Sequence, residues 1–139
     1  TYGSVALWSA LTLKLALLTQ LSNPIAAMIA AHTLSRTIAI SLTCSMNYVQ
    51  DIDLSKSKPL AKSLSNTDLT IIIITALASL LLIPHQAIAV CIALLVIRQL
   101  CITWFRKQIS GYTGDTLGAC QQITEIGIYA AIIIATGTA

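Results

Sequence analysis

The sequence predicts an all-α integral membrane protein with about five transmembrane helices. Of its 139 residues, 56% are hydrophobic and only 9% are charged, whereas soluble domains average about 25% charged residues. The apolar residues also come in long blocks, as membrane-spanning helices require. We expect one membrane-embedded domain over residues 1–139, part of a larger helical membrane domain, with helices at about 5–21, 25–46, 69–83, 87–105 and 116–135.

The first two helices follow from the apolar runs on either side of a proline. Residues 5–21 are at the short end of the roughly 17–25 residues that span a bilayer, and Lys14 lies in the middle of this run. Pro24 suits the first turn of the second helix, because the N–H that it lacks would have no partner there. The second run, 25–46, is interrupted by His32, Ser35 and Arg36.

The remaining helices lie between polar connections. Residues 47–68 lead to a run rich in isoleucine and leucine, which we expect to be helical because an isolated strand leaves its backbone unsatisfied in a bilayer. The turn at 84–86 precedes the fourth helix, which contains Arg98. A turn with two glycines then leads into the fifth helix, and Asp115 is expected at its N-cap.

The basic residues predict the orientation of the chain. If all five helices cross, the connections at 47–68 and 105–115 lie on one side and the turns at 22–24 and 84–86 lie on the other. Only the first pair contains Lys or Arg, namely Lys56, Lys58, Lys62, Arg106 and Lys107. The positive-inside rule therefore places both polar connections, and the N-terminus, in the cytoplasm.

Charge and cysteine content disfavour two other kinds of protein. The formal net charge of +3 is small and clustered, so nucleic acid is not an expected partner. The four cysteines show no paired spacing, which indicates neither a disulfide framework nor a zinc site.

Four charged residues are predicted to lie inside the membrane at a common depth, roughly 12–15 Å below the cytoplasmic surface: Lys14, Arg36, Arg98 and Glu125. Such groups face a partner or a wet cavity, because each costs at least a few kcal/mol in lipid. Three cations against one anion favour a polar cavity that awaits an anion. The alternative is that Glu125 pairs with Arg36 or Arg98 and that Lys14 snorkels to the surface.

Two helix faces support the cavity. On the fifth helix, four residues share an arc of about 80° at 100° per residue: Asp115, Gly118, Gln122 and Glu125. On the second helix, His32, Ser35 and Arg36 lie on one side. His32 alone would more often be a hydrogen-bonded residue between helices, and its two polar neighbours raise the case for a functional role.

The turn before the fifth helix is a candidate metal site. It is not a P-loop, since no Lys follows its last glycine. A Mg²⁺ ion on Asp115 could bridge the carboxylate and a diphosphate, and Gly111 and Gly114 would let the backbone approach the ligand closely. A simple helix cap is the alternative. Glu125 lies about 15 Å further along the same helix, too far away to share the ion.

Several stretches resemble the cobalamin synthase family, the adenosylcobinamide-GDP ribazoletransferases of vitamin B12 assembly. Gly111-Tyr112-Thr113-Gly114-Asp115-Thr116-Leu117-Gly118-Ala119, followed by Gln122 and Glu125, is similar to the C-terminal signature of that family. His32-Thr33-Leu34-Ser35-Arg36 is similar to its His-x-x-Ser-Arg stretch, and Lys56-Ser57-Lys58-Pro59-Leu60-Ala61 to its polar loop. Ser110 stands where the family often has a second glycine.

The resemblance implies a transferase of the bacterial inner membrane that needs Mg²⁺. It would join α-ribazole, or its 5′-phosphate, to adenosylcobinamide-GDP and release GMP, which completes cobalamin biosynthesis. Together with the buried charges, the matching positions indicate catalytic roles for Asp115, Glu125 and Arg36, with Asp115 as the metal ligand. They indicate substrate-binding roles for ten further residues: Gly111, Thr113, Gly114, Gly118, Gln122, His32, Ser35, Lys14, Lys58 and Arg98.

One departure from the family concerns an acidic, glycine-containing motif in its N-terminal half, which is absent here. We therefore expect an N-terminal part of the same protein as a partner, and no turnover by the chain alone. Two alternatives stay open: a membrane phosphotransferase of the CDP-alcohol type, although the Asp-Gly-x-x-Ala-Arg pattern is lacking, and a small transporter or channel subunit whose buried charges mark a solute path.

Overall fold

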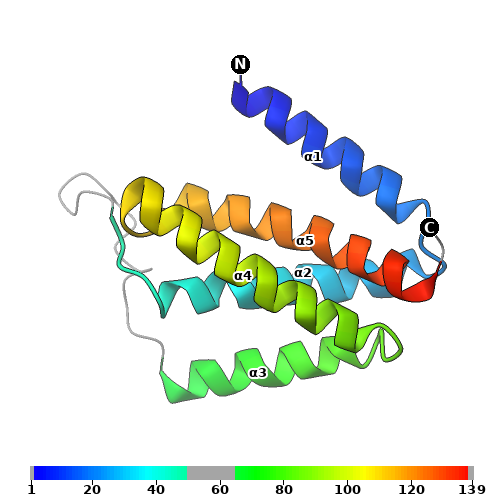
Figure 1. Cartoon of the computed structure of the whole chain (residues 1–139). Coiled ribbons are helices and arrows are strands. Elements are labelled where there is room, and N and C mark those ends of the chain that lie inside the picture. The colour runs from blue at the N-terminus through cyan, green and yellow to red at the C-terminus, as the bar shows by residue number, and fades with distance from the viewer. Residues whose placement is uncertain (1, 50–64, 138–139) are drawn as a thin grey trace.

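The computed structural model describes residues 2–49 and 65–137, which form five helices (Figure 1): α1 (Tyr2–Leu18), α2 (Pro24–Thr43), α3 (Asn66–Leu80), α4 (Ala87–Ile109) and α5 (Gly114–Thr136). The predicted all-α class and the number of helices are confirmed for this part of the chain. The largest difference at a helix end is in α4, which continues to Ile109 where the sequence predicted an end at residue 105.

Three of the five helices are long and apolar enough to cross a membrane. They are α2 with 20 residues, and α4 and α5 with 23 residues each. The apolar helices α1 and α3 have 17 and 15 residues, whereas a hydrocarbon layer about 30 Å thick is spanned by about 20 helical residues. The chain is therefore a helical membrane protein in which two helices are short for a full crossing.

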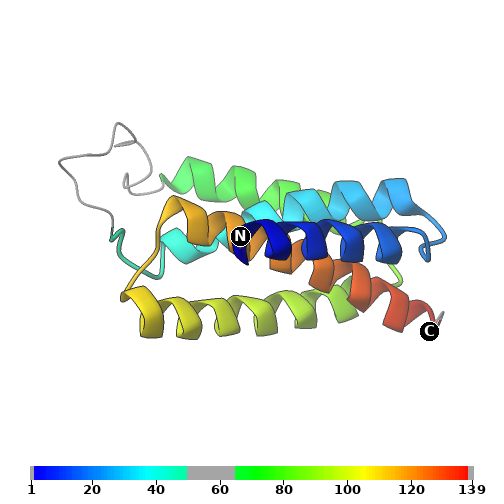
Figure 2. The same ribbon diagram turned by 90° about the horizontal axis from the view of Figure 1, so that it is seen from above.

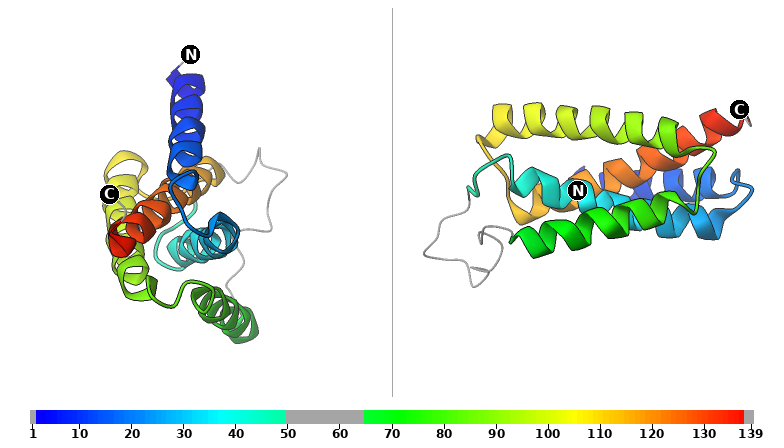
Figure 3. Two further views of the ribbon diagram at one scale, coloured as in Figure 1. Left: turned by 90° about the vertical axis from the view of Figure 1, so that its right-hand side faces the viewer. Right: turned by 90° about the horizontal axis from the view of Figure 1, so that it is seen from below.

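The helix α5 lies at the centre of the arrangement. It packs against α1, α2 and α4, and α3 packs against the other side of α2. In the end-on view of Figure 3, α1 and α3 accordingly lie at opposite edges. Figure 1 shows that α1 diverges from the bundle toward its N-terminus, and Tyr2, Val5 and Trp8 in that half are exposed.

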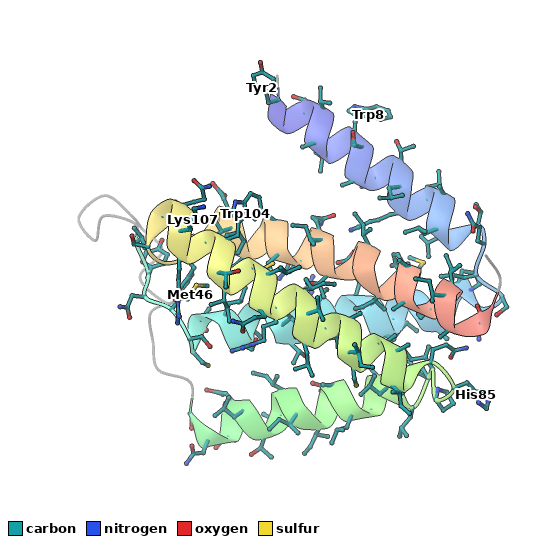
Figure 4. The ribbon with its side chains drawn as sticks, viewed as in Figure 1. Tyr2, Trp8, Met46, His85, Trp104 and Lys107 are labelled. Carbon is teal, nitrogen blue, oxygen red and sulfur yellow. The ribbon has the colours of Figure 1, made fainter. Side chains whose placement is uncertain are left out.

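The helices alternate in direction, as the predicted topology requires. The end of α2, the start of α3 and the connection from α4 to α5 lie at one end of the molecule, and the turns at 19–23 and 81–86 lie at the other (Figure 2). Trp104 and Lys107 are near the first end and His85 is at the second (Figure 4). The described ends of the first polar connection and the whole of the second therefore share one end, which we call the polar end.

Small residues let α2 and α5 approach each other closely. Ala27, Ala30, Ala31 and Ala39 of α2 are buried, and the largest fully buried side chain of the described residues is Tyr129 of α5. Alanine-rich interfaces are typical of helix packing in membranes, where close backbone contact replaces the hydrophobic effect as the main attraction. This packing holds the faces of α2 and α5 in a fixed register.

At the polar end, the segments that follow α2 and α4 are joined. The Tyr112 N–H donates to the Asn47 carbonyl at 3.0 Å, and the Val49 N–H donates to the Tyr112 carbonyl at 3.1 Å. The Tyr48 and Tyr112 rings pack edge to face with centroids 5.5 Å apart. Burial raises the pKa of the Tyr112 phenol, and the neighbouring Tyr48 adds to this effect. A Cβ on Gly111 would collide with the Asn47 carbonyl oxygen and the Val49 side chain, so the join requires glycine.

The residues around this join also determine where α4 ends and α5 begins. Ser110 ends α4 in the left-handed conformation, with φ of 60°, which costs an L-residue roughly 1–2 kcal/mol relative to glycine. The prediction of Asp115 as the N-cap of α5 is wrong. The N-cap is Thr113, whose hydroxyl accepts from the Thr116 N–H while the Thr116 hydroxyl accepts from the Thr113 N–H. This reciprocal pair satisfies two N–H groups at once, and it leaves Asp115 exposed in the first turn.

Replacement of Gly111 by alanine should destabilise the protein, because the new methyl group has no room against the Asn47 backbone. Overpacking of this kind costs about 1–3 kcal/mol. Gly118→Ala is the matched control, because a Cβ there meets nothing within 4 Å, and alanine in a helix should stabilise by up to about 1 kcal/mol. The free energy of unfolding in mixed micelles, followed by circular dichroism, should change with opposite sign in the two variants. Equal changes would contradict the proposed contact.

Candidate functional site

Glu125 is the centre of a polar cluster that joins three helices. Its side chain is only 6% exposed, and its Oε2 accepts a hydrogen bond from Lys14 Nζ of α1 at 2.5 Å. Its Oε1 lies 3.1 Å from His32 Nδ1 and accepts a 3.4 Å bond from Ser35 Oγ, both on α2. Lys14 Nζ also donates to Gln122 Oε1 of α5 at 2.5 Å. We call these five residues the Glu125 cluster.

The spacing of polar residues along each helix explains why these side chains meet. Residues three apart lie on one helix face, as do His32 with Ser35 and Gln122 with Glu125. Because α2 and α5 pack against each other, these two polar faces are brought together inside the bundle. Lys14 is added from α1, which also packs against α5.

Lys14 and Glu125 neutralise each other within an apolar bundle. The Lys14 side chain is 12% exposed, so both charges are largely withdrawn from solvent and their attraction is weakly screened. A carboxylate oxygen only accepts hydrogen bonds, so His32 donates from Nδ1, and in the neutral ring Nε2 is then an acceptor. The His32 side chain is 54% exposed, which leaves its ring accessible from outside the cluster.

The alternative in which Glu125 pairs with an arginine and Lys14 snorkels is wrong. Arg98 Nε donates to Ser41 Oγ at 2.9 Å, and its second terminal nitrogen donates to Ser45 Oγ at 2.5 Å. Arg106 donates to the Ser45 carbonyl at 2.8 Å. Both guanidinium groups thus stabilise the C-terminal end of α2, where unpaired carbonyls and the helix dipole favour cations. The substrate-binding role of Arg98 stays a prediction.

Arg36 is separate from the Glu125 cluster. It is exposed on α2, and together with His32 it lines a cavity between α2 and α3. Among the described residues, Arg36 has no hydrogen bond or ion pair. Its predicted catalytic role therefore stays a prediction, and the structure adds that its charge has no partner in the described part of the chain.

The turn before α5 does not form a complete metal site with the described residues. Within residues 2–49 and 65–137, no group of three His, Cys, Asp or Glu side chains could hold a metal ion. Asp115 offers one exposed carboxylate, and a Cβ at Gly114 would meet nothing within 4 Å. This hard oxygen donor fits one position of a Mg²⁺ coordination sphere, which commonly uses one or two carboxylates with phosphates and waters. The predicted substrate contact Lys58 lies outside the described residues.

The ion pair at the centre of the site was missed by sequence reasoning. Lys14 and Glu125 were assigned the same depth, and the sequence contains only one acidic residue inside the predicted helices beyond their first turns. Because three cations are predicted at the same depth, the partner of Glu125 could be restricted to Lys14, Arg36 and Arg98. The sequence could not select Lys14, because the choice depends on which helices pack on α5.

The fold and the Glu125 cluster define a helical membrane protein with a polar site buried inside its bundle. Comparison with known proteins gives the family. Residues 1–133 match the family model described as cobalamin-5-phosphate synthase, and the chain belongs to this family, as the resemblance implied. No solved structure was found to match the chain.

Curated relatives carry the name adenosylcobinamide-GDP ribazoletransferase. One from Shewanella piezotolerans is 47% identical over 140 residues, which is 96% of this chain and 54% of the relative. One from Vibrio cholerae is 47% identical over 133 residues, which is 93% of this chain and 51% of the relative. One from Shewanella oneidensis is 43% identical over 143 residues, which is 99% of this chain and 55% of the relative. The chain thus spans about half the length of the curated relatives that it matches, and the matches favour the first of the three functions weighed from the sequence.

Removal of Lys14 should destabilise the protein because it leaves a buried carboxylate without its cation. Loss of one partner of a buried pair costs about 3–5 kcal/mol. The double variant Lys14→Met with Glu125→Gln has no buried anion left. Lys14→Met alone should therefore unfold in mixed micelles at a lower fraction of denaturing detergent than this double variant. Lys107→Met, at an exposed position in the last turn of α4, is the control and should change the stability by less than about 0.5 kcal/mol. A double variant no more stable than Lys14→Met would contradict the pairing.

Proposed function

We propose that this chain forms the C-terminal membrane part of an adenosylcobinamide-GDP ribazoletransferase. The enzyme would transfer cobinamide phosphate from adenosylcobinamide-GDP to α-ribazole or its 5′-phosphate and release GMP. Membership of the cobalamin-5-phosphate synthase family and the names of the relatives support the activity. The single structural observation that carries the proposal is the Glu125 cluster, because an accessible histidine oriented by a buried carboxylate suits proton transfer.

The reaction needs one proton acceptor and stabilisation of the transferred phosphoryl group. A ribose hydroxyl of the acceptor attacks the phosphorus that carries cobinamide, and a new P–O bond forms. The bond from this phosphorus to the bridging oxygen of the diphosphate breaks, and GMP leaves with that oxygen. The proton of the hydroxyl passes to a base. Catalysis of phosphoryl transfer depends mainly on positioning and on charge stabilisation.

His32 is the base that the geometry favours. Its Nδ1 donates to Glu125 Oε1 at 3.1 Å, which fixes the tautomer and leaves Nε2 free to accept the hydroxyl proton. Glu125 then stabilises the imidazolium that forms. Lys14, bonded to the other carboxylate oxygen, holds Glu125 in place. Lys14, Ser35 and Gln122 are therefore positioning residues in this proposal.

Asp115 is proposed as one ligand of Mg²⁺ at the polar end. When bound, the ion would neutralise diphosphate charge and aid the departure of GMP. Asp115 offers an exposed carboxylate at the start of α5, and Gly114 and Gly118 leave open space beside it. The other ligands would come from the substrate, from water or from parts of the protein outside the described residues.

The location and the partner are further parts of the proposal. Arg106 and Lys107 lie in the last turn of α4, at the polar end, and the positive-inside rule assigns this end to the cytoplasm. The membrane would be the inner membrane of a bacterium, the kind of organism from which the relatives come. Because those relatives are about twice as long, we propose that an N-terminal part of the same protein completes the site and that the chain alone has no turnover.

The activity is tested with the full-length protein in lipid nanodiscs, supplied with adenosylcobinamide-GDP, α-ribazole and Mg²⁺. GMP release is measured by chromatography. His32→Gln and Glu125→Gln should lower kcat by roughly 10²- to 10⁴-fold, the usual contribution of a general base. Asp115→Asn should raise the Mg²⁺ concentration needed for half-maximal rate.

The control variant is Lys107→Gln, an exposed residue at the polar end, which should keep the normal rate. Absence of GMP from the unaltered protein would refute the proposed activity. Normal kcat in Glu125→Gln would show instead that the cluster is only structural, and Asp115→Asn with an unchanged Mg²⁺ requirement would remove the metal assignment.

A further inference from the structure

A polar cavity of about 510 Å³ lies at the polar end, between the ends of α2 and α4. Its volume falls in the range of about 300–1,000 Å³ that is usual for small-molecule sites. Met46, one of its lining residues, marks its position in Figure 4. The cavity is lined by residues 43–47, Arg106 and Ser110, which include one cation and no acidic side chain.

Arg106 supplies this cavity with hydrogen-bond donors. One of its terminal nitrogens donates to the Ser45 carbonyl at 2.8 Å, and this is its one hydrogen bond within residues 2–49 and 65–137. A guanidinium group has five N–H donors in a fixed planar fork, so the bond to Ser45 orients the group and leaves donors for a ligand. Because Arg106 is exposed, a ligand in the cavity can reach them.

The end of α2 supplies hydrogen-bond acceptors, because the last carbonyls of a helix have no partner within it. The Leu42 carbonyl accepts from the Ser45 and Met46 N–H groups, whereas the Thr43 and Cys44 carbonyls accept no hydrogen bond in the described part of the chain. Thr43 and Cys44 both line the cavity. The cavity therefore combines the donors of one arginine with unpaired backbone acceptors.

We propose that this cavity binds the guanine base of the nucleotide donor and that Arg106 determines the preference for guanine over adenine. The inference rests on the proposed function, in which the donor is linked to GDP. Guanine presents O6 and N7 as neighbouring acceptors, the pair to which a guanidinium group donates two hydrogen bonds. Its N1–H and its amino group are donors that suit the backbone carbonyls at the end of α2. Adenine has an amino group in place of O6, so it would leave donors of Arg106 unpaired.

The position of the cavity suits the rest of the proposed site. Ser110 lines the cavity and ends α4, and the turn that follows it leads to Asp115 in the first turn of α5. These two residues are joined by at most about 18 Å of extended chain. A nucleotide with its base at Arg106 would thus have its diphosphate at the same end of the molecule as the proposed metal ligand.

The first experiment measures the Kd of mononucleotides for the full-length protein in phosphatidylcholine nanodiscs by equilibrium dialysis, without acceptor and hence without turnover. GMP should bind more tightly than AMP by roughly tenfold or more. Arg106→Met should weaken the binding of GMP by roughly 10- to 100-fold, as expected for the loss of an arginine–guanine pair, and leave the binding of AMP within about twofold. Lys107→Gln removes the neighbouring exposed charge and should bind both nucleotides as the unaltered protein does.

A second experiment locates the nucleotide without any substitution. Cys44 is exposed and lines the cavity, so a bound base should shield its thiol from a water-soluble maleimide. At about ten times its Kd, GMP leaves roughly one tenth of the sites empty, and the alkylation of Cys44, followed by mass spectrometry of its peptide, should slow to a similar extent. AMP at the same concentration binds more weakly and should slow the alkylation by no more than about twofold.

Failure to bind GMP, or equal affinities for GMP and AMP, would overturn the proposal. Equal losses of both nucleotides in Arg106→Met would also overturn it, because Arg106 would then contact the phosphate that they share. Unchanged alkylation of Cys44 in protein that has bound GMP would place the base outside this cavity. The activity is judged separately, since a protein that releases GMP from its donor but shows none of these preferences would retain the proposed function and lose this inference.

Discussion

The burial of one carboxylate among apolar helices is the constraint on which the rest of the structure depends. Withdrawal of Glu125 from water costs several kcal/mol unless charge and hydrogen bonds compensate, and the compensation comes from α1 and α2. Apolar contacts alone select helix partners weakly in a bilayer, because lipid chains replace them. The Glu125 cluster therefore acts together with the packing of small residues in selecting which faces of α1 and α2 meet α5, and it does so with groups that are also suited to chemistry.

The level that Lys14 and Glu125 share could be predicted from the sequence, but the partners of the individual charges could not. The helical rise fixes how far a residue lies from the end of its span, and on this basis Lys14 and Glu125 were assigned to one level. Arg98 was assigned to the same level, yet it contacts Ser41 and Ser45 on α2. The partner that a charged side chain meets depends on the rotation of its helix and on which helices lie beside it, and both follow from packing over the whole bundle. The sequence therefore predicts the layer of a polar site more reliably than its pairings.

The turn before α5 differs from the sequence prediction in its N-cap residue and in the role of Gly111. Competition between neighbouring residues explains the first difference, and a contact with a distant part of the chain explains the second. Thr113 and Asp115 are both good N-cap residues, and the reciprocal bonds between Thr113 and Thr116 decide for the threonine. The sequence predicts that Gly111 lets a ligand approach the backbone closely. The structure shows a packing reason for glycine: a side chain here would collide with the Asn47 backbone, which lies far earlier in the chain. That proximity arises only when α2 and α4 end at the same level, so no local pattern could reveal it.

The three cations that the sequence predicts at one depth differ in how their charge is compensated. Of the three cations predicted at one depth, Lys14 is neutralised by Glu125 and Arg98 is stabilised by the oxygens at the end of α2. Arg36 retains an uncompensated charge among the described residues. Such a charge lowers stability in the absence of a ligand and gains most when an anion binds, so selection for folding alone would favour its loss. Because Arg36 lies one helical turn from His32, an anion bound there would lie beside the proposed base.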